Sequence, residues 1–206
     1  MNLLRVVTVL LLGGVIMGST ESGAATPAAK SADKAKVAVA AKTGEDVAVL
    51  QTSLGTIVFR FFDKDAPKHV ANFKKLAGEK FYDGTTFHRV IPGFMIQGGD
   101  PNSKDADRAN DGMGNAGHNV DAEFNANKHL RGTVSMARSN DPNSASCQFF
   151  ICVKPQTFLD GKYSVFGQVI EGMEVVDKIV AVPRDARDNP IDKVIMEKVT
   201  LDKRKL

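Results

Sequence analysis

The sequence predicts a mainly β domain, a closed eight-stranded antiparallel barrel capped by two α-helices. The first observation is a series of eight short apolar or alternating segments bounded by Gly, Pro, Asn or Asp, as in strands joined by turns. The second is that only two segments have helical spacing, without the alternation of a βαβ rhythm. The third is a physical constraint, because closure removes the exposed edges of a sheet.

The strands are expected at 47–51, 56–62, 85–91, 94–99, 131–137, 147–153, 163–169 and 191–201. Ser53-Leu54-Gly55 is a hairpin signal between the first two segments. Pro92-Gly93 separates the third from the fourth. The long polar stretch 101–127 is expected to be a functional or mobile loop. It lacks the central glycine and closing glutamate of an EF-hand.

Two helices are expected, at 66–78 and 172–183. In the first, Val70, Phe73 and Leu76 fall on one face, and Ala77 extends that face. Pro67 suits its first turn and Gly78 its end. In the second, the apolar face holds Met173, Val176, Ile179 and Val180, and Pro183 follows the end.

The first 45 residues differ from the rest. Residues 1–25 combine Arg5, an apolar stretch from Val6 to Met17 and small residues up to Ala25, which is typical of a cleaved signal peptide. An uncleaved membrane anchor is the alternative, although twelve apolar residues are few for a span. Residues 26–45, rich in Ala and Lys, are expected to be a flexible linker, and 46–206 the folded domain.

Composition narrows the functional classes. The 206 residues carry a formal net charge of +3 with scattered cations, so a nucleic-acid-binding protein is not indicated. On a strand, Cys147 and Cys152 would point to opposite faces about 16 Å apart. They are expected to be free thiols or to pair outside this hairpin, and they lack partners for a zinc site.

The segment FHRVIPGFMIQGGD, residues 87–100, places polar groups among apolar ones. On a regular strand Phe87, Arg89 and Ile91 share one face, and Met95 shares a face with Gln97. The adjacent Phe149 and Phe150 must likewise point to opposite sides of a sheet. An outward apolar patch beside directed polar groups is typical of a binding groove. The alternative is that Arg89 merely covers a core edge.

These segments resemble the cyclophilins, a family of peptidyl-prolyl cis-trans isomerases. FHRVIPGFMIQGGD matches the family's most specific signature almost residue for residue. GTVSMA, SCQFFI, FLDGKYSVFGQV and GMEVVDKI match further blocks in the same order, so the resemblance covers about 46–201. This resemblance implies an eight-stranded barrel with a helix at each open end. Within the family, the chain is similar to the bacterial, exported branch.

The resemblance implies roles for individual residues. Arg89 corresponds to the essential arginine, and Gln97 orients Arg89 or holds the substrate backbone. Ala137 and Arg138 lie where the family binds the substrate backbone, although Arg138 replaces a commoner Asn. Phe94, Met95, Phe150 and Leu159 match the pocket for the proline ring. Tyr163 can form a wall of that pocket and donate a hydrogen bond, and Phe158 is a further substrate-binding position. Neither a cofactor nor a metal is required, since no covalent bond is made or broken.

Phe158 and Tyr163 depart from many eukaryotic members, which have Trp and His at these positions. Loss of the indole N–H is expected to weaken cyclosporin binding. His88 is expected to be structural, and His69, His118 and His129 surface or structural residues.

The resulting hypothesis is an isomerase that rotates Xaa-Pro bonds by transition-state stabilisation. Its partners would be proline-containing peptides and unfolded client proteins in the periplasm, or outside the cell as a second choice. A peptide-binding chaperone with little catalysis is the alternative. A structural envelope protein held by an uncleaved signal is a third.

Overall fold

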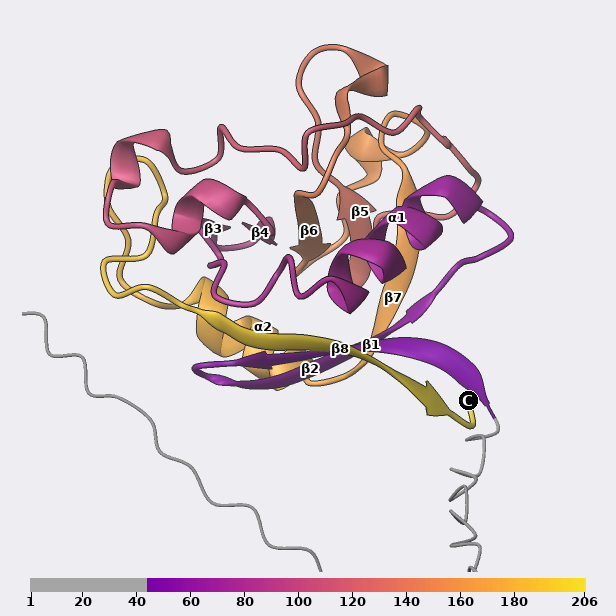
Figure 1. Cartoon of the computed structure of the whole chain (residues 1–206), viewed down its shortest axis with the longest axis horizontal. Helices are drawn as coiled ribbons and strands as arrows, with labels where there is room; N and C mark the ends of the chain where they lie inside the picture. The colour runs from indigo at the N-terminus through magenta and orange to yellow at the C-terminus, as the bar shows by residue number, and fades with distance from the viewer. Residues whose placement is uncertain (1–43) are drawn as a thin grey trace, which may run out of the picture. The chain divides into compact units, whose positions relative to one another are not determined.

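In the computed structural model, which describes residues 44–206, eight antiparallel strands form one curled sheet (Figure 1). Its order is β3-β4-β6-β5-β7-β2-β1-β8. The strands are β1 (Glu45–Thr52), β2 (Gly55–Phe61), β3 (Arg89–Ile91), β4 (Met95–Gly98), β5 (Thr133–Met136), β6 (Phe149–Cys152), β7 (Val165–Glu171) and β8 (Met196–Arg204). The mainly β class and the eight strands are therefore confirmed.

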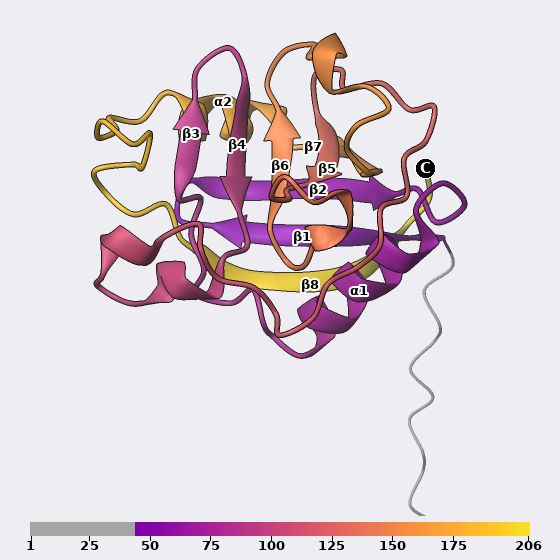
Figure 2. The ribbon, with the colours of Figure 1, turned by 90° about the horizontal axis from the view of Figure 1, so that it is seen from above.

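The sheet folds over itself, so that β3, β4, β6 and β5 pass across β1, β2 and β8 (Figure 2). One row of side chains from four strands faces the interior between these layers. The register pairs Val90 with Ile96, Ile96 with Ile151, and Ile151 with Val134, and all four side chains are fully buried. Alternate residues on the same strands therefore point outward.

The closed barrel predicted from the sequence is not seen: the sheet is an open half-barrel. The two edge strands, β3 and β8, share no ladder within residues 44–206. The segments before them meet at one isolated bridge, Thr86 with Ile195. Residues 85–88 do not continue β3, and the Thr86 N–H donates to Ser103 Oγ at 2.9 Å rather than to a neighbouring strand.

Both predicted helices form. Helix α1 (Pro67–Gly78) packs against β7 and β8, and its buried residues include Val70, Phe73 and Leu76. Its first turn lacks a side-chain cap at Ala66, and the Glu123 carboxylate instead accepts the N–H groups of residues 68 and 69, each at 3.0 Å.

Helix α2 (Met173–Val180) packs against β2, β3 and β4 and buries Val175, Val176, Ile179 and Val180. It begins after Gly172, whose φ of +89° and close approach to the Thr56 carbonyl leave no room for a Cβ. Four short 3₁₀ turns complete the elements: Pro101–Lys104, Arg108–Asn110, Pro142–Ser144 and Thr157–Leu159.

One residue of the signature segment lies elsewhere than predicted. Phe87 is fully buried in the main core, whereas Arg89 is exposed, so the two do not share a face. The reason is that β3 begins only at Arg89, so the period-two alternation of this strand does not extend back to Phe87. The opposite orientations of Phe149 and Phe150 are confirmed, because they belong to two different apolar clusters.

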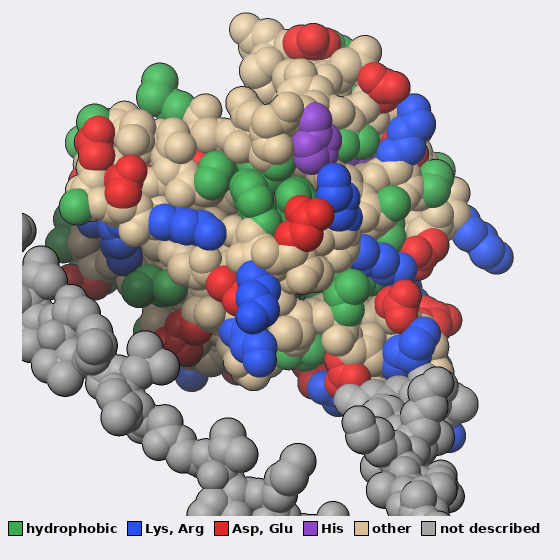
Figure 3. All heavy atoms as spheres, viewed as in Figure 1, with side chains coloured by type: hydrophobic (Ala, Val, Ile, Leu, Met, Phe, Trp, Pro, Cys, Tyr) green, Lys and Arg blue, Asp and Glu red, His purple; other side chains and the backbone are tan. Residues whose placement is uncertain are grey.

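Cys147 and Cys152 are buried free thiols, as expected, and burial raises the pKa of each to about 12. The predicted signal peptide and nearly all of the linker lie outside the described residues, while Glu45 belongs to β1. Within residues 44–206 no helix is long and apolar enough to cross a membrane. On the face seen in Figure 3, positive and negative side chains are interspersed.

Candidate active site

A row of outward-facing side chains crosses four neighbouring strands. The register places Arg89 on β3 opposite Gln97 on β4, Gln97 opposite Phe150 on β6, and Phe150 opposite Ser135 on β5. Because the side-chain period of a strand is two, this row alternates with the buried row that begins at Val90. The pleat of the sheet alone therefore brings a guanidinium, an amide and a phenyl ring together.

Next to this row lies a small apolar cluster, separate from the main core. Its buried members are Met95, Phe150, Cys152 and Leu159, with four partly buried residues packed against them: Ile91, Phe94, Ala137 and Tyr163. The cluster surrounds an open cavity of about 180 Å³. The cavity is lined by Arg89, Phe94, Met95, Gln97, Ala137, Arg138, Phe150, Leu159 and Tyr163. We call it the apolar cavity.

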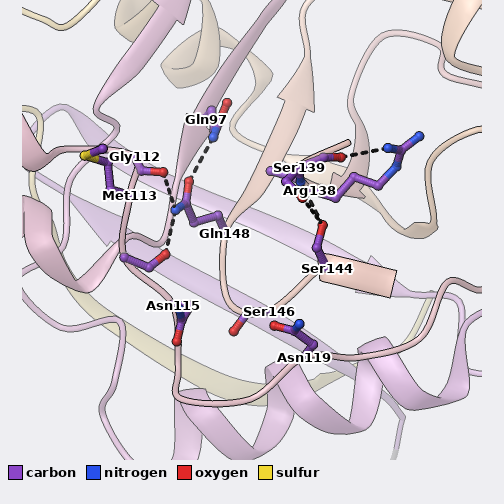
Figure 4. Close-up of a pocket in the computed structure, with 12 residues that line it drawn as sticks. Gln97, Gly112, Met113, Asn115, Asn119, Arg138, Ser139, Ser144, Ser146 and Gln148 are labelled. Carbon is purple, nitrogen blue, oxygen red and sulfur yellow. Dashed lines mark hydrogen bonds between the residues drawn. The ribbon is translucent and has the colours of Figure 1, made fainter. Parts of the chain in front are cut away.

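A chain of hydrogen bonds holds Arg89 at the wall of the apolar cavity. Arg89 Nη1 donates to Gln97 Oε1 at 3.4 Å, and Gln97 Nε2 donates to Gln148 Oε1 at 2.9 Å. Gln148 Nε2 donates in turn to the carbonyls of Gly112 and Gly114, as Figure 4 shows. The guanidinium has five N–H donors, so most of them stay free to meet a ligand.

Gln148 was not assigned a role from the sequence. It lies two residues before Phe150, just ahead of β6, and that period-two spacing could have indicated its place on the same outward face.

Ala137 and Arg138 form the opposite wall. The Ala137 N–H is already used, since it donates to the Gln148 carbonyl at 2.9 Å. The Arg138 guanidinium lies 4.5 Å from the centre of the Tyr163 ring and donates to the carbonyls of Lys162 and Ser139. Its side chain therefore points away from Gln148 (Figure 4) and packs against the Tyr163 ring.

Phe158 and Leu159, both predicted to bind substrate, point in different directions from the 3₁₀ turn Thr157–Leu159. Leu159 points into the apolar cluster, whereas Phe158 is 60% exposed and does not line the apolar cavity. The Phe158 ring instead contacts the Phe94 ring, with centroids 5.8 Å apart. It extends the apolar surface at the edge of the cavity rather than its floor.

The floor of the cavity has a support that the sequence did not reveal. The fully buried His129 ring lies nearly parallel to the Phe150 ring, at 6.0 Å between centroids and 12° between planes. His129 Nδ1 lies 3.1 Å from an Asp160 carboxylate oxygen, and Nε2 lies 3.1 Å from Ser135 Oγ. A lone His in a loop gives no sequence signal for this role; the prediction that His129 is structural agrees with its place.

We expect the protein to lose stability as the pH falls from 7.5 to 5.5. Burial lowers the pKa of His69, His88 and His129 below their ordinary value of 6.5. Below 6.5 the unfolded chain therefore binds protons that the folded chain does not, and the unfolding free energy falls by up to about 1.4 kcal/mol per pH unit for each such histidine. Denaturant titrations at a series of pH values measure this slope.

In the range from pH 7.5 to 5.5, the change in stability comes from the histidines and not from the carboxylates. The lowered pKa of Asp46, Asp177 and Asp185 acts only near and below their ordinary value of 3.8. The matched control is His69→Gln, which should remove the contribution of one histidine from the slope. A flat profile between pH 7.5 and 5.5 would contradict the assignment.

Two further hollows adjoin the apolar cavity. One, of about 360 Å³, lies between the loop 112–119 and the segment 137–148 and shares Gln97, Ala137 and Arg138 with the cavity (Figure 4). The other, of about 240 Å³, lies on the far side of Arg89 and Gln97. Gln97 therefore lines all three depressions, and Arg89, which donates to it, lines the apolar cavity and the 240 Å³ hollow.

Comparisons with known proteins agree with this geometry. A family model described as "Cyclophilin type peptidyl-prolyl cis-trans isomerase/CLD" matches residues 47–201. A peptidyl-prolyl cis-trans isomerase of Synechococcus elongatus is 45% identical over 155 residues, which cover 75% of this chain and 97% of that protein. A probable peptidyl-prolyl cis-trans isomerase of Brucella abortus is 43% identical over 166 residues, covering 77% and 84%.

Among solved structures, a Cryptosporidium parvum cyclophilin-type isomerase crystallised in the presence of the dipeptide Ala-Pro is similar. It superimposes with a TM-score of 0.70 at 32% identity, covering 77% of this chain and 99% of the other. The family match spans the whole described sheet except the first two residues of β1 and the last three residues of β8. The chain thus belongs to the cyclophilin-type peptidyl-prolyl cis-trans isomerase family, and it is an isomerase.

Proposed function

We propose that the apolar cavity grips the proline ring of a peptide while Arg89 stabilises the twisted Xaa-Pro bond. The observation that carries this proposal is the guanidinium of Arg89 on the wall of a cavity otherwise lined mainly by apolar side chains. All the predicted site residues except Phe158 line that cavity. The Ala-Pro dipeptide named for the Cryptosporidium protein supports proline-containing peptides as the substrate class.

The chemistry needs a fixed donor rather than a nucleophile. A planar imide resists rotation by about 18–20 kcal/mol because twisting breaks amide resonance. In the twisted state the proline nitrogen becomes pyramidal and regains a lone pair, which accepts a hydrogen bond better than the planar nitrogen does. A guanidinium held beside it lowers the barrier, since it binds the twisted state more tightly than either planar isomer.

Gln97 is the positioning residue in this scheme. Its amide is held by Gln148, which the carbonyls of Gly112 and Gly114 hold in turn. The side-chain amides of Gln97 and Gln148 each accept a hydrogen bond through the oxygen and donate one through the nitrogen, so only one orientation of each amide satisfies all of these hydrogen bonds. Arg89 is consequently preorganised, and little reorganisation is needed at the moment of rotation.

One hydrogen bond does not supply the whole acceleration. A rate gain of about 10⁵ corresponds to about 7 kcal/mol. A hydrogen bond from a charged donor contributes about 1.5–3 kcal/mol. The remainder is assigned to the apolar cavity, whose side chains displace water from the proline ring, and to binding of the flanking residues in the adjoining hollows.

We further propose that the enzyme accelerates proline-limited folding in the periplasm. The features of residues 1–25 support export, and slow proline isomerisation limits folding of many chains. The test has two parts: refolding of a client with a non-native proline isomer, and fractionation of cells that make the full chain. We expect catalytic amounts of enzyme to speed the slow phase, and a periplasmic form whose mass lacks the first 24 or 25 residues.

Each part has its own contrary outcome. An unchanged slow refolding phase would contradict catalysis of folding. An intact chain found only in the cytosolic or membrane fraction would contradict export with cleavage.

A further inference from the structure

Seven of the nine residues that line the 240 Å³ hollow beyond Arg89 and Gln97 have polar or charged side chains. We call it the basic hollow. It is built from four separate parts of the chain, namely β3, β4, the loop 108–113 and the loop 187–189. Its lining consists of His88, Arg89, Gln97, Arg108, Asp111, Gly112, Met113, Arg187 and Asn189. Because Arg89 and Gln97 line both spaces, a peptide bound in the apolar cavity passes close to this hollow.

Cations outnumber carboxylates there. Arg89, Arg108 and Arg187 line the hollow, and none of them has an ion-pair partner within 4.0 Å among the described residues. Asp111 is the only carboxylate in the lining. Asp185 lies nearby, and the N–H groups of Asn189 and Arg187 lower the pKa of its carboxyl. Asp100 also acts on His88, and its carboxylate accepts the Gly112 N–H, so the three arginines face three carboxylates, of which only Asp111 lines the hollow.

The loops that carry these cations are fixed to each other. Arg108 donates to the Ile191 carbonyl at 2.9 Å, to Asn189 Oδ1 at 2.6 Å and to the Pro190 carbonyl. Asn189 Nδ2 donates to Asp111 Oδ2 at 2.6 Å. Arg187 Nη2 donates only to the Arg108 carbonyl, at 3.1 Å, and its exposed guanidinium keeps other donors free. The hollow is therefore a preformed site with one adaptable cation.

A buried group in the wall is also poorly satisfied. His88 is only 4% exposed, and within residues 44–206 neither ring nitrogen has a hydrogen bond of ordinary geometry, its nearest backbone partner being the Thr86 backbone. Unsatisfied polar atoms at buried positions cost about 1–3 kcal/mol, so they are rarely retained without a partner. A ligand that enters the hollow could accept a hydrogen bond from the His88 ring.

We propose that the basic hollow is a second subsite, which binds the carboxylate of a Glu or Asp close in sequence to the substrate proline. This proposal rests on the function proposed for the apolar cavity. Arg187 supplies the adaptable charge, His88 supplies a neutral donor, and Arg89 is shared between the two spaces. The enzyme would then favour acidic clients at one position and lose that preference as salt screens the charges.

The experiment compares octapeptides with a single proline that differ only in one Glu or Gln. The variable residue is placed in turn at each position from two before to three after the proline, and kcat/KM is measured by NMR exchange. We expect one position at which Glu is favoured over Gln by about tenfold, equivalent to about 1.4 kcal/mol. The gain should lie in KM, because the carboxylate binds all rotational states alike.

Three variants test the assignment. Arg187→Gln should reduce the preference for Glu to within about twofold, since it removes the adaptable charge. Asp111→Asn keeps the acceptor for Asn189 but removes the opposing charge, so the preference should rise. Arg184→Gln is the matched control: it lies on the same loop, but its side chain pairs with Asp188 at 3.0 Å and does not line the hollow.

The outcomes separate the two proposals. Equal kcat/KM for Glu and Gln at every position, or an unchanged preference in Arg187→Gln, overturns the subsite while the isomerase mechanism stands. Failure of the parent protein to accelerate any of the peptides overturns the mechanism proposed for the apolar cavity.

Discussion

Replacing Arg89 with alanine should lower kcat/KM for proline peptides by about 10²–10³, the loss seen when one preorganised transition-state donor is removed. The loss should fall on kcat, because the donor acts mainly on the pyramidal nitrogen of the twisted state. The fold should persist, since Arg89 is exposed at an edge strand and its side chain makes one hydrogen bond among the described residues, to Gln97. NMR exchange on parent and variant measures both effects.

Two matched variants isolate the geometry of the donor. Arg89→Lys keeps the charge but not the planar fork, and it should recover only a small part of the activity. Arg138→Ala removes the other arginine of the apolar cavity, whose guanidinium is occupied by carbonyls and the Tyr163 ring. It should change KM by a few-fold at most. An Arg89→Ala protein that turns over peptides like the parent would refute the mechanism.

Replacing Phe73 with alanine should lower the unfolding free energy by about 3–5 kcal/mol, as expected for a large cavity in a rigid core. Phe73 is 1% exposed and projects from α1 into the interior of the half-barrel. Its ring contacts five other aromatic rings, those of Phe59, Phe61, Tyr82, Phe149 and Phe166. Truncation therefore removes packing from the helix and the sheet at once.

Phe158→Ala is the matched control, because it deletes the same atoms from a side chain that is 60% exposed. It should change the unfolding free energy by less than about 0.5 kcal/mol. Urea titration of the three proteins supplies the comparison. A loss below 1.5 kcal/mol for Phe73→Ala would mean that the core relaxes around the gap, contrary to the close packing inferred here.

The cyclophilin resemblance, the eight strands and the two helices could all be predicted from the sequence. Period-two and period-3.6 patterns are local, so they identify which residues can share a face. They correctly separated Phe149 from Phe150 and placed Arg89 near Gln97 across the Pro92-Gly93 turn. They failed at Phe87 and at barrel closure, because residues 85–88 lie outside β3 and meet the start of β8 through an isolated bridge and backbone hydrogen bonds rather than a continuous ladder.

The amino-acid order by itself determined the elements, the family resemblance and the set of residues around the apolar cavity. Only the tertiary structure decided that Gln148 holds Gln97, that His129 lies beneath Phe150, and that Phe158 lies outside the cavity. The tertiary structure also formed the basic hollow, where Arg108 donates a hydrogen bond to Asn189, 81 positions further along the chain. Such contacts depend on how distant loops are brought together, and no local periodicity encodes that.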